Sequence, residues 1–208
     1  ESLGLASHLK NWQLAHTAAW GDVNADGRPD LYIGAFADRP YFGKADAPIP
    51  NMLFLNRDDG FELSTETSIR LQGKRARNSC SIFLDLDNDG DLDLFVSTHA
   101  DKAPRPDATD GHTYYQGRLF ENLGDGRFRD RTPTEGDWPR PFAARNVSCL
   151  DFDQDGRLDL ILGDGSYRHW RRNTGQLVIL RNRGNWSFTN VSDKLGFPKK
   201  GTVAMGFA

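Results

Sequence analysis

Apolar residues occur along this chain in short runs, separated by clusters of aspartate, asparagine and glycine. This pattern predicts β-strands joined by turns. Six of the runs form three pairs, and each pair encloses a loop rich in aspartate. The runs are HTAAW, SIFL and VSCL before the loops, and LYIGA, LFVST and LILGD after them. No segment has the 3.6-residue periodicity of an amphipathic helix. The chain is therefore predicted to be all-β.

A second pattern follows each pair of runs after a long polar segment. Its three copies are NMLFLNRDDGF, RLFENLGDGRF and LVILRNRGNWSF, at residues 51–61, 118–128 and 177–188. Asp-Gly and Gly-Asn turns between apolar runs are typical of β-hairpins. Each repeat therefore holds four strands, and four antiparallel strands in roughly 60 residues are typical of a propeller blade. The predicted fold is a β-propeller of four-stranded antiparallel blades, with about three and a half blades present.

The three aspartate-rich loops, here called the first, second and third acidic loops, are DVNADGRPD, DLDNDGDLD and DFDQDGRLD. They span residues 22–30, 85–93 and 151–159, so their starts lie 63 and 66 residues apart. Each has oxygen-bearing side chains at positions 1, 3, 5 and 9, and a glycine at position 6 that tolerates a positive φ. Calcium takes about six to eight oxygen ligands in a flexible shell. The loops therefore predict three Ca²⁺ sites, with an ion-free Asp/Asn/Gly turn as the alternative.

The predicted ligands of each site are four side chains and one backbone carbonyl. The side chains are Asp22, Asn24, Asp26 and Asp30; Asp85, Asp87, Asp89 and Asp93; and Asp151, Asp153, Asp155 and Asp159. The carbonyls are those of Arg28, Asp91 and Arg157.

Calcium is favoured over other metals by the donor set. Magnesium prefers a strict octahedron that keeps its waters, and zinc or copper sites favour cysteine or histidine, which no acidic loop contains. The loops begin like EF-hands but do not end like them. An EF-hand needs a glutamate at position 12, where this chain has Ile33, Val96 and Leu162. Each loop is therefore predicted to close a β-hairpin around its ion.

The combination of these loops with the motif L/I-x-x-N-x-G-x-x-x-F resembles the FG-GAP/VCBS repeats of integrin-α propellers and of many secreted bacterial proteins. Within these, the pattern is most similar to the ASPIC/UnbV or cartilage acidic protein-like group. The second and third repeats carry the motif at Leu119, Asn122, Gly124 and Phe128, and at Ile179, Asn182, Gly184 and Phe188. The first repeat departs from it, with Asp58 in place of the glycine. The resemblance implies calcium at one face of a propeller.

The spacing of the repeats divides the chain as one partial propeller over residues 1–208. The expected parts are the tail of a preceding blade (1–13), blades with the three acidic loops (14–72, 79–135 and 145–197), and the inner strand of a next blade (201–208). Closed propellers usually need about four to eight blades. We therefore expect the remaining blades to come from the same chain or from another one.

Composition limits the cellular compartments and the classes of partner that we expect for this chain. The formal charge is −3, and eleven of the 29 acidic residues occupy predicted ligand positions. No apolar run approaches the length of a membrane span, and no signal peptide is present, although one could have been removed upstream. Weak, acidic calcium sites suit a calcium-rich space, so the expected location is secreted, periplasmic or cell-surface. Basic residues form two short patches, which argues against nucleic acid. Cys80 and Cys149 are predicted to be free thiols, with a disulfide as the alternative.

Long polar segments between the second and third strands of each repeat should leave the face opposite the metal. Such segments on a rigid scaffold often bind ligands. The candidate ligand-binding residues are Tyr41, His99, His112, Tyr114, Tyr115, Tyr167, His169, Trp170, Arg171 and Arg172. Aromatic, histidine and arginine side chains suit a glycan or protein partner. The alternatives are a lyase or dehydratase that uses histidine and tyrosine as acid and base, and a structural subunit of a larger assembly. No catalytic residue is assigned.

Overall fold

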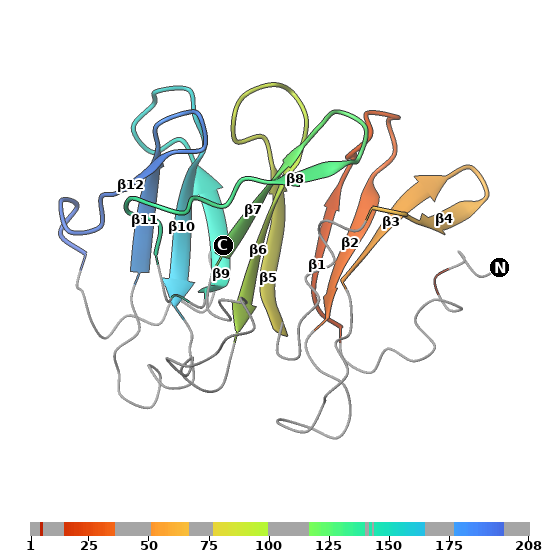
Figure 1. Ribbon diagram of the computed structural model, residues 1–208, viewed down its shortest axis with the longest axis horizontal. Helices are drawn as coiled ribbons and strands as arrows, with labels where there is room; N and C mark the ends of the chain where they lie inside the picture. Colours follow the sequence, from red (N-terminus) through yellow and green to blue (C-terminus); the bar gives the residue numbers. More distant parts are fainter. Residues whose placement is uncertain are drawn as a thin grey trace, which may run out of the picture.

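The computed structural model describes residues 5, 15–35, 51–66, 77–99, 117–139, 142, 144–164 and 177–197. In this part of the chain, twelve strands form three four-stranded antiparallel sheets (Figure 1). The first sheet contains β1 (Ala15–Gly21), β2 (Asp30–Ala35), β3 (Met52–Arg57) and β4 (Gly60–Leu63). The second contains β5 (Arg77–Leu84), β6 (Asp93–His99), β7 (Gly117–Asn122) and β8 (Phe128–Asp130). The third contains β9 (Ala144–Leu150), β10 (Asp159–Asp164), β11 (Leu177–Asn182) and β12 (Phe188–Asn190).

Each sheet is built in chain order, so every strand pairs with the strand that follows it. The acidic loops join the first two strands of each sheet, and the register at these loops is the same in all three. The residue before each loop pairs with its ninth residue: Gly21 with Asp30, Leu84 with Asp93 and Leu150 with Asp159. The predicted all-β class and the four-stranded antiparallel repeats are confirmed.

The second sheet lies between the other two (Figure 1). Its first strand, β5, packs against β1 and β2 on one side and against β9 on the other. The first strands of neighbouring sheets are thus the ones that meet most closely. The twelve described strands do not close into a ring.

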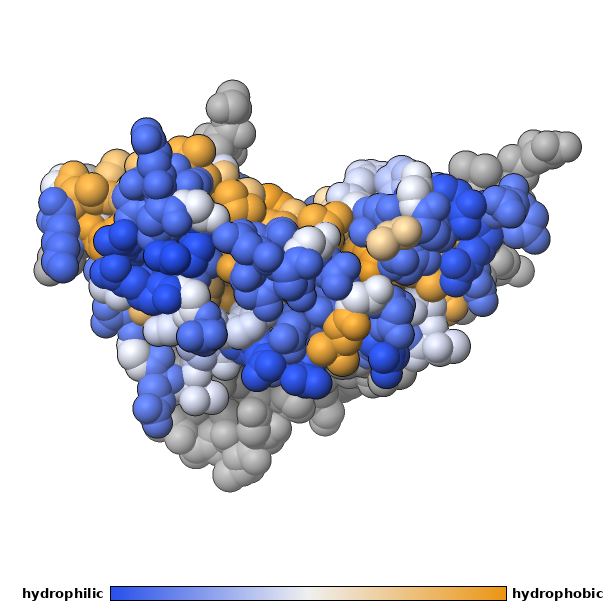
Figure 2. All heavy atoms as spheres, turned by 90° about the horizontal axis from the view of Figure 1, so that it is seen from above, coloured by the Kyte–Doolittle hydropathy of each residue, from blue (hydrophilic) through white to orange (hydrophobic). Residues whose placement is uncertain are grey.

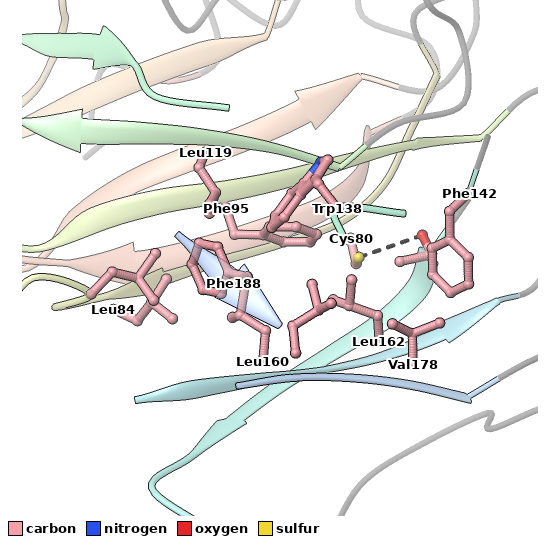
Figure 3. Close-up of a cluster of buried hydrophobic side chains, with 13 residues drawn as sticks. Cys80, Leu84, Phe95, Leu119, Trp138, Phe142, Leu160, Leu162, Val178 and Phe188 are labelled. Carbon is pink, nitrogen blue, oxygen red and sulfur yellow. Dashed lines mark hydrogen bonds between the residues drawn. The ribbon is translucent and has the colours of Figure 1, made fainter. Parts of the chain in front are cut away.

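Two apolar cores hold the sheets together. Between the first and second sheets, Tyr32 and Phe120 are fully buried with their neighbours. Between the second and third, Phe95, Trp138 and Phe188 form the centre of a larger cluster (Figure 3). Full burial of one large apolar side chain stabilises the fold by about 1.5–3 kcal/mol. The interfaces between sheets therefore supply much of the stability.

Close packing in the larger core requires a glycine at position 117. A Cβ atom there would lie 2.6 Å from the Phe95 ring, inside van der Waals contact. The Gly117 carbonyl also accepts a hydrogen bond of 3.1 Å from the Trp138 indole N–H. The absence of a side chain thus lets Phe95 and Trp138 pack against the end of β7.

Both cysteines are free thiols, as predicted. They project from facing sheets into the same core, where Cys80 is buried and Cys149 is half-buried. Figure 3 shows the Cys80 thiol beside the Ala144 carbonyl, at 3.5 Å. Burial raises the pKa of Cys80 to about 12, so this thiol stays protonated and unreactive.

Asparagine side chains at the ends of β7 and β11 connect neighbouring sheets. The Asn122 amide donates to the Leu92 carbonyl of its own acidic loop (3.1 Å) and to the Val23 carbonyl of the preceding loop (2.8 Å). Asn182 makes the same pair of bonds, to Leu158 (3.1 Å) and Leu86 (2.8 Å).

The counterpart in the first sheet is Asn56. Within the described residues, its amide donates to the Pro29 carbonyl of its own loop, at 3.1 Å, and reaches no second loop. Asn122 and Asn182 are almost completely buried. The shared geometry of Asn122 and Asn182 links the hairpins of the second and third sheets to the sheet before each.

Replacing the linking asparagines should destabilise the protein unequally. Asn182→Ala removes the amide donor from the buried Leu86 carbonyl and from the part-buried Leu158 carbonyl, so it should lower the free energy of unfolding by about 1–3 kcal/mol. Asn56→Ala is the matched control, because it removes an exposed bond within one sheet, and it should cost less than about 1 kcal/mol. Urea denaturation of both variants measures the difference. Equal losses would contradict the link between sheets.

Candidate metal sites

The three acidic loops share one backbone conformation. The glycine at position 6 has a positive φ in each, at 84°, 96° and 85° for Gly27, Gly90 and Gly156. This confirms the conformational role predicted for glycine. Position 4 also has a positive φ, at 55°, 62° and 60° for Ala25, Asn88 and Gln154. Alanine and glutamine give no sequence signal for this conformation, so the second left-handed residue was missed.

The first aspartate of each loop closes the turn by accepting backbone hydrogen bonds. Asp22 accepts from Asp26 N (3.0 Å) and Gly27 N (2.7 Å). Asp151 accepts from Asp155 N (3.0 Å) and Gly156 N (2.9 Å). In the second loop, Gly90 N donates to Asp85 at 3.1 Å. The side chains at positions 3 and 5 are thereby directed to the same side as position 1.

Carboxylates converge in the second and third loops. Oxygens of Asp85, Asp87 and Asp89 all lie within 4.8 Å of one another, and so do oxygens of Asp151, Asp153 and Asp155. In the first loop the middle residue is neutral, and the Asn24 amide donates to Asp26 at 3.1 Å. The predicted residues at positions 1, 3 and 5 are therefore brought together.

In the described part of the chain, buried carboxylate oxygens without a hydrogen-bond partner occur in the second loop and, at Asp153, in the third. Asp85 Oδ1 and Asp87 Oδ1 are buried, and each has no hydrogen-bond partner among the described residues. A buried carboxylate oxygen without a donor is costly. A hard cation with oxygen ligands would compensate for it.

The aspartate at position 9 has a second role that the sequence did not reveal. Asp30, Asp93 and Asp159 are fully buried. Each accepts one backbone N–H from loop position 2 and one from the asparagine at the end of the third strand. For Asp93 the donors are Leu86 and Asn122, both at 2.9 Å.

The same pair of bonds occurs in the other loops. Asp30 accepts from Val23 (3.0 Å) and Asn56 (2.8 Å). Asp159 accepts from Phe152 (3.2 Å) and Asn182 (2.7 Å). A carboxylate oxygen has more than one lone pair, so metal ligation by position 9 stays a prediction alongside this observed role.

Burial shifts the ionisation of these aspartates. It raises the pKa of Asp93 to about 7, and the charges of Asp87 and Asp89 act in the same direction. Burial also raises the pKa of Asp30 and of Asp159. A bound divalent cation would favour the ionised forms and oppose these shifts.

Arginine side chains lie on the carboxylates of the first and third loops. Arg28 and Arg57 approach Asp26, at 3.0 and 3.5 Å. In the third loop, Arg157 lies 2.5 Å from Asp155, and Arg181 contacts both Asp153 and Asp155. Figure 2 shows the edge that carries the loops, where hydrophilic residues dominate the surface. The sequence predicted carbonyl ligands at Arg28 and Arg157 but not this role of their side chains.

The second loop has acidic residues at the corresponding places. Position 7 is Asp91, and Glu121 takes the place of Arg181 before the hairpin asparagine. Glu121 is engaged by Arg131 at 2.9 Å and Arg129 at 3.6 Å. Burial and the charges of Asp89, Asp85 and Glu121 raise the pKa of Asp87. Among the described residues, no arginine or lysine pairs with the aspartates of this loop.

Most of the predicted ligand-binding residues lie outside the described residues. These are Tyr41, His112, Tyr114, Tyr115, Tyr167, His169, Trp170, Arg171 and Arg172. His99 is the last residue of β6. Strands β2, β6 and β10 end at the sheet edge opposite the acidic loops, where the segments that follow them begin. The structure thus separates the acidic loops from the start of these segments.

Comparison with known families gives one match. A family model described as an FG-GAP-like repeat matches residues 22–96 and 106–162, which is more than half of the chain. No curated protein matched. Within the described part of the chain, no helix has the length and apolar character of a membrane span.

Proposed function

The chain belongs to the FG-GAP-like repeat family, and we propose that it is a calcium-stabilised β-propeller segment that serves as a binding module. The observation that carries the proposal is the second acidic loop. There, carboxylates of Asp85, Asp87 and Asp89 converge, and two of their oxygens are buried without a donor. Calcium would neutralise these charges and stabilise the folded loop.

In this proposal, each loop holds one ion through positions 1, 3, 5 and 9 and the carbonyl of position 7. The ion would not take part in catalysis. It would tie the first two strands of a sheet to each other, because positions 1 and 9 flank the loop at the ends of these strands. The backbone of the loop is already arranged by its own hydrogen bonds, so the ion would bind a largely formed site.

The propeller arrangement is supported by the open faces of the outer sheets. Trp20, Phe83 and Cys149 each lie two residues before an acidic loop. Phe83 packs toward the first sheet, with its ring 6.3 Å from Tyr32, whereas Trp20 is 57% exposed. On the opposite open face, Leu150 is 56% exposed.

The residue that corresponds to Leu150 in the second sheet is Leu84, which is 3% exposed against the third sheet. The two most exposed large apolar residues in the described chain therefore occupy positions that a neighbouring sheet covers elsewhere. We propose that further sheets of the same kind cover both open faces, from this chain or another.

The segments opposite the acidic loops are the proposed contact surface for a glycan or protein partner. The support is positional, because residues 36–50, 100–116 and 165–176 connect the second and third strands of each sheet in the sequence and carry most of the candidate aromatic and basic residues. A secreted, periplasmic or cell-surface location is proposed because calcium is abundant there.

A partner that binds through these segments should lose affinity when Trp170 and Arg171 are replaced by alanine. A glycan array and a protein pull-down, each run with calcium and with EDTA, measure this. Binding that is lost only when EDTA is added would indicate that calcium supports binding by stabilising the fold. Binding that is unaffected by the substitutions would place the contact surface elsewhere. Turnover of a glycan would favour the lyase alternative, and stable co-assembly with other subunits would favour the structural one.

Calcium should raise the melting temperature of the EDTA-treated protein, because a ligand that binds only the folded state stabilises it by mass action. At a free calcium concentration of about 100 Kd, the gain is about 2.7 kcal/mol for one site. Asp87→Asn should reduce the gain. Asp59→Asn, the same change in an exposed turn, is the matched control and should leave it intact. A melting temperature that is unaffected by calcium would refute the calcium proposal.

If neighbouring sheets cover the two open faces in the assembled protein, the isolated chain should self-associate through the exposed Trp20 and Leu150. Trp20→Lys and Leu150→Lys should each weaken this association in sedimentation velocity, because burial of a lysine charge against an apolar face is costly. Leu195→Lys is the control, since Leu195 is 47% exposed but follows β12 and does not flank an acidic loop. Equal effects of all three substitutions would contradict the assignment.

A further inference from the structure

The three acidic loops share a motif but differ in whether arginine side chains lie beside their carboxylates. We propose that the second loop is the high-affinity, calcium-dependent site, and that arginines act as built-in counter-cations in the first and third loops. These arginines would lower the calcium affinity of the outer loops and keep them folded without the ion. The inference rests on the proposed function, namely that the loops bind calcium.

The third loop shows the arrangement most clearly. Arg157, at position 7, places its guanidinium 2.5 Å from Asp155. Its Nε donates to the Asn182 carbonyl at 3.2 Å, so the side chain is fixed between the loop and the hairpin. Arg181 reaches the same loop from β11 and contacts Asp153 and, at 3.1 Å, Asp155. Two guanidinium groups thus face the carboxylates that a metal would use.

The first loop repeats half of this arrangement and is less acidic. Arg28, also at position 7, lies 3.0 Å from Asp26 and donates through Nε to the Asn56 carbonyl at 2.9 Å. Arg57 adds a second guanidinium 3.5 Å from Asp26. Position 3 is the neutral Asn24, so the loop has one carboxylate fewer than the third loop and two fewer than the second.

The second loop has acidic residues at both positions where the third loop has arginines. Position 7 is Asp91, and the residue before the hairpin asparagine is Glu121, which Arg131 holds at 2.9 Å. In the described structure, Asp85 and Asp87 each keep one buried oxygen without a hydrogen-bond donor; the third loop has such oxygens at Asp153, but there the Arg181 guanidinium lies beside the carboxylate. The five aspartates of this loop, with Glu121 nearby, therefore have no paired arginine or lysine among the described residues.

The difference has a direct consequence for ion binding. Calcium affinity of such loops depends on the number of charged ligands and on the rigidity of the site. In the outer loops, calcium must displace or repel guanidinium groups, which costs part of the binding energy. In the second loop, calcium relieves repulsion between carboxylates. Calcium should therefore fill the second loop first, and its removal should destabilise the second sheet most.

Each loop contains a reporter of its own occupancy. The N–H groups of Gly27, Gly90 and Gly156 donate to the first aspartate of their loops, at 2.7, 3.1 and 2.9 Å. Titration of the EDTA-treated 208-residue chain with CaCl₂, followed by the NMR shifts of these three amides, gives an apparent affinity for each loop. The Gly90 signal should saturate at the lowest calcium concentration.

Two substitutions should reduce or reverse the difference in calcium affinity between the second and third loops. Arg181→Gln removes a guanidinium from the third loop and should tighten the Gly156 transition by roughly threefold to tenfold. Asp91→Arg introduces the position-7 arginine into the second loop and should weaken the Gly90 transition by a similar factor. Arg183→Gln is the matched control, because Arg183 is exposed on the same hairpin and bonds to Thr189. It should leave all three transitions unchanged.

The outcomes separate this inference from the proposed function. If all three amides respond to calcium at one concentration and neither Arg181→Gln nor Asp91→Arg shifts any of them, the arginine inference is wrong and calcium binding stands. If no amide responds at millimolar calcium in any variant, calcium binding itself is wrong and the inference falls with it. Circular dichroism of each variant in EDTA verifies that the sheets are folded.

Discussion

The fold depends on one buried carboxylate in each repeat. Asp30, Asp93 and Asp159 are fully buried, and each accepts two backbone N–H groups from different parts of its sheet. One donor comes from the acidic loop and the other from the end of the third strand. The carboxylate thus fixes the second strand, the third strand and the loop relative to one another. A buried charge of this kind is costly unless it is well compensated, so the surrounding polar groups are constrained as well.

The asparagine beside this carboxylate carries the constraint into the next sheet. In Asn122 the backbone N–H bonds to Asp93, while the side-chain amide bonds to the Val23 carbonyl of the preceding loop. Asn182 does the same with Asp159 and Leu86. A single residue therefore joins the polar centre of its own sheet to the loop of its neighbour. Coupling of this kind acts between adjacent repeats, as expected of a repeat architecture.

The repeat order, the four strands of each sheet and the glycine turns were predictable from the sequence because their signals are local. Alternation of apolar and polar residues specifies a strand, and Asp-Gly pairs specify turns. Contacts between distant residues left no such signal. Asn122 was recognised as part of a motif, but its bond to Val23 spans 99 residues. The arginine contacts were hidden for the same reason, since Arg181 and Asp155 are neighbours only after β11 pairs with β10.

In these repeats, the hydrogen bonds that shape the loops do not depend on the charges of the side chains around them. The backbone N–H of position 2 donates to the aspartate side chain of position 9 in all three loops, although the residues at position 2 are Val23, Leu86 and Phe152. The side chains beside the loop carboxylates differ, with arginines in the first and third loops and the acidic Asp91 and Glu121 in the second. Hydrogen bonds made by the backbone tolerate such changes, because they do not involve the side chains that vary. Under the proposed calcium scheme, the same sheet would be built with or without a demand for an external cation, according to the residues at position 7 and beside the hairpin asparagine.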